Sequence, residues 1–73
     1  MIEYLNNRGN SPITHYQIST QSITVWFKGG KSYCYSYNGD AGKQNVEKMK
    51  ELANLGTGLS AFITQNVRFD YDK

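Results

Sequence analysis

The stretch ITVWFKGGKSYCYSY, residues 23–37, contains two runs of alternating apolar and polar residues joined by a pair of glycines. A period of two in segments rich in β-branched and aromatic residues predicts the two strands of a hairpin. The position of the turn decides which side chains share a face, because a shift of one residue moves every side chain to the other face. The register of this hairpin therefore decides how the rest of the chain is arranged.

Two registers are compatible with the pair of glycines. A two-residue turn places Lys28 and Lys31 opposite each other, which is unfavourable for like charges. A three-residue loop over residues 28–30, with its second glycine in the left-handed region, pairs Val25 with Tyr33. This second register gathers nearly all the large side chains on one face. We therefore expect it, with the alternating tyrosines on the face that the rest of the chain covers.

A third strand precedes the hairpin. Residues 13–19 show the same alternation of apolar and polar positions. We therefore expect a three-stranded antiparallel meander with strands at 13–19, 22–28 and 31–37.

Two helices are predicted after the strands. The segment KQNVEKMKELANLG, residues 43–56, carries apolar residues at helical spacing, with Asp40 as its expected cap and Gly56 as its end. A second helix is expected to follow, with Thr57 or Ser60 as its cap. Two helices can cover only one face of so small a sheet, so the predicted fold class is a two-layer α+β domain with both helices on one face. The apolar stripe of the second helix consists of Leu59, Phe62, Ile63 and Val67.

Length and composition limit the possible functions. With 73 residues and a net charge of +2, the chain offers one domain, no deep catalytic cleft, and less positive charge than a dedicated DNA-binding domain. Residues 1–12 contain the turn-forming run NNRGNSP, so we expect a loosely held N-terminal arm before a single domain over 13–71. The single cysteine, and the absence of a signal peptide or an apolar membrane segment, indicate a cytoplasmic protein without membrane contact.

The order of these motifs resembles the KTSC domain, a short module found at the C-terminus of some lysyl-tRNA synthetases and alone in small bacterial and phage-type proteins. The similarity consists of Tyr33-Cys34-Tyr35 after a glycine turn, LANLGTGLSAFI at residues 52–63, and a V-R-x-x-Y ending at residues 67–71. It covers about residues 16 to 71. The proline-free connection at residues 36–45 departs from the family, whose members often carry Val-Pro there. The resemblance implies an α+β fold and suggests RNA binding through the association with a synthetase.

The face opposite the helices is predicted to carry Trp26 among small polar residues. A nucleic-acid base stacked on an exposed aromatic ring contributes ~1–3 kcal/mol, and nearby lysines or arginines hold its phosphates. The predicted nucleic-acid or partner site therefore consists of Trp26, Lys28, Lys31, Lys43 and Arg68. The alternatives are that the N-terminal arm or a second copy of the protein covers Trp26.

Other positions give weaker indications. Backbone amides near Thr57 and Gly58, at the start of the second predicted helix, form a candidate anion site. His15 has no carboxylate near it in the sequence, and Cys34 lacks the cationic neighbour that activates a thiol. The sequence therefore predicts no catalytic residue, no metal site, no cofactor and no enzymatic activity.

Three functions remain open at this point. The first is a non-enzymatic module that binds RNA through the open sheet face and its basic rim. The second is a protein interaction module that binds a larger protein or a second copy of itself, as small phage-type accessory or inhibitor proteins do. The third is a protein that sequesters a nucleotide in a small pocket.

Overall fold

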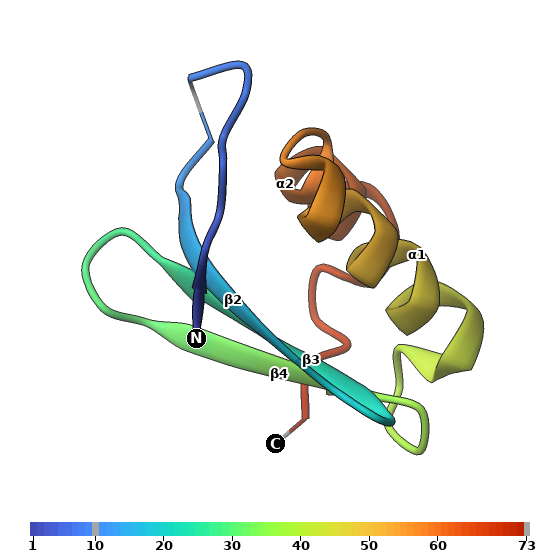
Figure 1. Cartoon of the computed structure of the whole chain (residues 1–73). Coiled ribbons are helices and arrows are strands. Elements are labelled where there is room, and N and C mark those ends of the chain that lie inside the picture. Colours follow the sequence, from blue (N-terminus) through green and yellow to red (C-terminus); the bar gives the residue numbers. More distant parts are fainter. Residues whose placement is uncertain (10, 73) are drawn as a thin grey trace.

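The computed structural model describes residues 1–9 and 11–72, and within them the chain forms a sheet covered on one side by helices (Figure 1). The strands pair antiparallel in sequence order, and they are β1 (Ile2–Glu3), β2 (Ile13–Ser19), β3 (Ser22–Phe27) and β4 (Ser32–Ser36). The helical layer consists of α1 (Gly42–Leu55), α2 (Leu59–Phe62) and a π-helical segment, η1 (Ile63–Val67). The predicted α+β class with a meander sheet is confirmed.

The β3–β4 hairpin has the register expected from the three-residue loop. Val25 pairs with Tyr33, and Ile23 pairs with Tyr35. The backbone N–H of Phe27 donates to the carbonyl oxygen of Lys31 at 2.8 Å, which closes the loop. Both loop glycines have positive φ, +94° at Gly29 and +88° at Gly30, a conformation that a residue with a Cβ rarely adopts.

This register places the core between β3, β4 and the helices. Ile23 and Val25 are fully buried, and Tyr35 is 1% exposed. The helical layer covers them with apolar side chains at a spacing of three or four residues, which places these side chains on one face of each helix. The buried residues of this layer are Val46, Met49, Ala53, Leu59, Ile63 and Val67.

The sequence predicts three strands, and the described residues form four. The additional strand, β1, lies within residues 1–12, the segment expected to be a loosely held arm. Ile2 pairs with Tyr16, and Tyr4 is 4% exposed in the core, where its hydroxyl accepts a hydrogen bond from the N–H of Leu59 at 3.4 Å. The strand was missed because two residues are too short for a periodic pattern, and because its stability comes from the edge of β2 and the burial of Tyr4.

The helix ends also differ in part from expectation. Gly56 ends α1 with φ of +78°, as predicted. Ala41 occupies the N-cap position of α1 in place of Asp40, without a side-chain hydrogen bond. Gly58, with φ of +81°, precedes α2, so neither Thr57 nor Ser60 caps it. None of the helices in the described ranges is long and apolar enough to cross a membrane.

Candidate nucleic-acid interface

The open face of the sheet carries a row of side chains that crosses the four strands. Trp26 pairs with His15 on β2 and with Ser32 on β4, and His15 pairs in turn with Glu3 on β1. Adjacent residues of a strand point to opposite faces, so this row lies on the side away from the buried Val25. Trp26 is partly exposed. The other β3 residues on this face, Ser22 and Thr24, are small and polar, so Trp26 is the large aromatic platform there.

The β3–β4 loop, which follows the strand that carries Trp26, contains two lysines. Lys28 follows β3 by one residue, Lys31 precedes β4, and both side chains are exposed. The N–H of Lys28 donates to the carbonyl oxygen of Pro12 at 2.8 Å, which ties the start of the loop to the segment before β2. The loop therefore presents two cations at the end of the strand that carries Trp26.

Lys43 and Arg68 belong to the helical layer. Lys43 is the second residue of α1, and its Nζ lies 5.8 Å from the centroid of the Tyr37 ring. Arg68 follows η1, and its guanidinium carbon lies 5.2 Å from the centroid of the Phe69 ring. Of the five residues predicted for one site, Trp26, Lys28 and Lys31 thus belong to one hairpin, whereas Lys43 and Arg68 belong to α1 and to the segment after η1.

The candidate anion site at Thr57 and Gly58 lies on the wall of a hollow of about 300 Å³. The hollow also receives Arg8 and Ser11, because the backbone N–H of Asn7 donates to the carbonyl oxygen of Gly56 at 2.7 Å and holds this segment against the end of α1. The sequence did not indicate Arg8 as a member of this site. It lies 48 positions before Gly56, in the segment expected to be loosely held.

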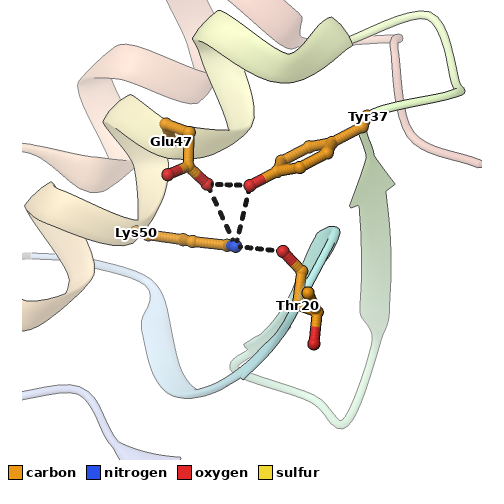
Figure 2. A network of polar contacts seen from close by, with 4 residues as sticks. All are labelled: Thr20, Tyr37, Glu47 and Lys50. Carbon is orange, nitrogen blue, oxygen red and sulfur yellow. Dashed lines mark hydrogen bonds and ion pairs between the residues drawn. The ribbon is translucent and has the colours of Figure 1, made fainter.

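A network of polar contacts, which sequence reasoning did not find, lies at the end of the sheet opposite the β3–β4 loop (Figure 2). The hydroxyl of Tyr37 donates to the carboxylate of Glu47 on α1. The Lys50 ammonium contacts the same carboxylate at 3.0 Å and donates to the carbonyl oxygen of Thr20, in the β2–β3 turn, at 3.1 Å. Through these contacts, Tyr37, Glu47 and Lys50 connect α1 to the end of β4 and to the β2–β3 turn.

The hydrogen bonds of this network shift the pKa values of its members. The Tyr37 hydroxyl, followed by the Lys50 ammonium, holds the pKa of Glu47 below its ordinary value. The hydrogen bond to Glu47 raises the pKa of Tyr37. Both groups are solvent-exposed, so the network acts as a surface clamp between α1 and the sheet.

Across residues 1–9 and 11–72, no group of three or more His, Cys, Asp or Glu side chains is arranged to hold a metal ion. Cys34 is a half-buried free thiol on β4.

The chain matches no protein-family model, no curated protein and no solved structure. The resemblance to the KTSC domain therefore stays a prediction.

Proposed function

We propose that this protein is a non-enzymatic, cytoplasmic module that binds single-stranded RNA on the open face of its sheet. The observation that supports this function is the position of Trp26, which is partly exposed on the face opposite the helices. The strand that carries Trp26 leads into a loop with two exposed lysines. An unpaired base stacks on the indole ring, and the lysines attract its phosphates. The resemblance to a module attached to some lysyl-tRNA synthetases is consistent with this function.

The charges on the open face give the binding a direction. Glu3 lies at the β1 end of the row that contains Trp26, whereas Lys28 and Lys31 lie at the β3–β4 loop. A phosphate backbone is repelled by the carboxylate and attracted by the ammonium groups. We therefore expect the RNA to run from Trp26 toward the β3–β4 loop and to avoid β1.

The experiment that tests this proposal uses Trp26 as its reporter. The protein is titrated with tRNA and with a short single-stranded RNA while tryptophan fluorescence is followed at low and moderate salt. Saturable quenching is expected with the single strand, with a log–log salt slope of about −1.4 if the two loop lysines each neutralise one phosphate. An unchanged signal with both RNAs contradicts the proposal.

Charge variants separate specific contacts from general attraction. Lys28→Ala and Lys31→Ala are each expected to reduce the salt slope by about 0.7, because each removes one phosphate contact. Lys48→Ala is the matched control, since Lys48 is an exposed lysine on α1 that pairs with Glu51 at 3.6 Å. Equal losses in all three variants would show that only net charge matters.

A second candidate function, protein interaction, is favoured by two exposed leucines where the N-terminal segment meets the end of α1. Leu5 is 66% exposed and Leu55 is 54% exposed. Leu5 lies against Gly56, the residue that follows Leu55 in the chain. Sedimentation equilibrium tests the homodimer form of this function: a mass that rises with concentration and returns to that of the monomer in Leu55→Asp supports it, and a monomer at all concentrations contradicts it.

A further inference from the structure

A second aromatic site lies on the helical side of the sheet, away from Trp26. A hollow of about 250 Å³ opens where the β3–β4 hairpin meets the segment after η1. Its wall is formed mainly by aromatic rings and one guanidinium group. The residues that matter for the argument are Phe27, Tyr33, Arg68, Phe69 and Tyr71; they are called the ring pocket below.

The rings of this pocket are arranged edge to face or tilted, and they leave one ring exposed. Tyr33 packs with its ring centroid 4.7 Å from that of Tyr71, and 5.8 Å from that of Phe27 in an edge-on contact. Phe69, by contrast, is 67% exposed, and the Arg68 guanidinium carbon lies 5.2 Å from its centroid. The pocket thus combines a preformed aromatic wall with an exposed ring and a planar cation.

These groups favour a flat, electron-rich ligand over an aliphatic one. Aromatic rings pair with other rings in offset or edge-to-face arrangements, and a guanidinium stacks on flat π surfaces. The hollow is smaller than the ~300–1,000 Å³ of pockets for drug-sized ligands, so it accommodates one ring system.

The charges around the pocket indicate what the ring is attached to. Arg68 is the cation in the wall of the pocket. The hairpin loop next to Phe27 adds Lys28, which follows Phe27 directly, and Lys31, whose backbone carbonyl oxygen accepts a hydrogen bond from the N–H of Phe27. Burial raises the pKa of Tyr35, which also lines the pocket, and the Asp70 carboxylate lies close enough to raise it further. An anionic group on the ligand is therefore directed away from Asp70, toward Arg68 and the hairpin loop.

We infer that the ring pocket binds a nucleobase that carries a phosphate. The base stacks against Phe69 and the tyrosine wall, and the phosphate faces Arg68 and the loop lysines. A free nucleoside monophosphate and an unpaired base within an RNA strand have the same recognised groups. This inference does not rest on Trp26, and it assigns functions to Arg68 and Phe69 that the open face does not need.

The test follows the backbone amide signals of the protein by two-dimensional NMR during titration with adenosine 5′-monophosphate, with ribose 5-phosphate and with a short single-stranded RNA. The nucleotide is expected to shift the amides of residues 68–71 with saturation. Ribose 5-phosphate, which has the phosphate without the base, is expected to leave them unchanged. Shifts with the RNA alone identify a base within a strand as the ligand, and shifts with both identify either source.

Two variants decide whether the rings are responsible. Phe69→Ala is expected to weaken binding of the nucleotide by roughly 5-fold or more, the usual loss of one stacking partner. The exposed position of Phe69 keeps the fold intact, which the dispersion of the NMR spectrum verifies. Ile2→Ala, a truncation of another exposed apolar side chain, is the control and is expected to bind as the unmodified protein does.

Several outcomes would overturn the inference. These are equal binding of adenosine 5′-monophosphate and ribose 5-phosphate, full affinity in Phe69→Ala, or no shift at residues 68–71 with any of the three ligands. Trp26 reports on the open face separately in the same spectra, through its indole N–H signal. If RNA shifts the Trp26 signal and not the amides of residues 68–71, the proposed function is supported and the ring pocket is contradicted. If RNA shifts the amides of residues 68–71 and not the Trp26 signal, the ring pocket is supported and the proposed function is contradicted.

Discussion

Adjacent residues of β3 lie in opposite environments. Ile23 and Val25 are fully buried beneath the helices, whereas Thr24 and Trp26 are partly exposed on the other face. All four belong to one strand with the same two neighbouring strands, so backbone hydrogen bonding does not distinguish them. The difference lies in what packs on each face. The covered face holds the fold together, and the open face is free to carry contacts with a partner.

The largest expected effect comes from substituting adjacent residues on the two faces. Ile23→Ala is expected to lower the free energy of unfolding by ~2–5 kcal/mol, because it removes buried methyl groups and leaves a cavity. Thr24→Ala, one residue away, is expected to cost less than ~1 kcal/mol. Urea denaturation measures both values. If Ile23→Ala does not fold, Ile23→Val, with an expected loss of ~0.5–1.5 kcal/mol, replaces it. Equal losses at positions 23 and 24 would contradict the division of the sheet into two faces.

The next effect tests how the N-terminal segment closes the covered face. A Cβ on Gly56 would lie 2.6 Å from the Cβ of Leu5, whereas a Cβ on Gly9 would meet no atom within 4 Å. Both glycines have φ of +78°, so Gly56→Ala and Gly9→Ala share the same backbone strain of ~1–2 kcal/mol. Gly56→Ala is expected to lose more stability than Gly9→Ala, because Leu5 must move and the hydrogen bond from Asn7 to Gly56 is disturbed. Identical losses in urea denaturation would mean that the segment is not held against α1.

The hairpin register was predictable because few arrangements satisfied the sequence. Only the loop over residues 28–30 gathers the large side chains on one face and keeps Lys28 away from Lys31. The helix α1 was predictable for a similar reason, since a periodic apolar stripe ends at a glycine. In both cases local patterns agree with the global fold.

Features that depend on contacts between distant residues were not predictable. The strand β1 depends on the burial of Tyr4, whose hydroxyl accepts a hydrogen bond from Leu59. The placement of Arg8 depends on Asn7, whose side chain donates to the carbonyl oxygen of Leu55. In both cases the two partners are 48 or more positions apart in the sequence.

The apolar positions 59, 63 and 67 are four residues apart, so they drift by about 40° at each step in an α-helix with 3.6 residues per turn. The wider π-helical turn from Ile63 to Val67 compensates for this drift and keeps both side chains buried.

The candidate site was predictable only as a list of residue types. Strand parity predicted Trp26 on the open face, which agrees with its pairing to His15 and Ser32, and the loop lysines were added because they are close to it in the sequence. Lys43 and Arg68 were grouped with them by charge alone, although a helix lies on the other side of the sheet from Trp26.

Alkaline pH distinguishes the buried tyrosine of the covered face from its neighbours. Burial, followed by the nearby charges of Tyr33, Tyr71 and Asp70, raises the pKa of Tyr35 from 10.0 to about 12. The folded state thus favours the neutral phenol, and the associated stability is complete below pH 10 and is lost as the pH rises through about 12. Tyr35→Phe is expected to lose less stability over this range than the unmodified protein does, as measured by thermal melts at increasing pH. Tyr33→Phe, the same change at a half-buried ring, is the control, and identical alkaline declines in all three proteins would contradict the prediction.

The smallest effect is expected at the exposed margin of the covered face, in the clamp formed by Tyr37, Glu47 and Lys50. The pKa of Glu47 is lowered from 4.5, so the stability that its carboxylate contributes is present above that pH and is lost as the pH falls through the lower folded value. Glu47→Gln is therefore expected to lower the melting temperature slightly at pH 7, and the difference from the unmodified protein is expected to vanish at strongly acidic pH.

Glu51→Gln is the matched control for the clamp, because Glu51 is an exposed glutamate on the same helix whose partner Lys48 makes no contact with the sheet among the described ion pairs. Its melting temperature is expected to change less than that of Glu47→Gln at pH 7, since it connects two residues of one helix and not a helix to a sheet. A deficit in Glu47→Gln that persists at acidic pH would show that side-chain shape, and not the carboxylate, maintains the contact between α1 and the strand ends. An equal effect of both substitutions would show that the clamp adds only what any surface charge adds, and that the covered face is held together by its buried side chains alone.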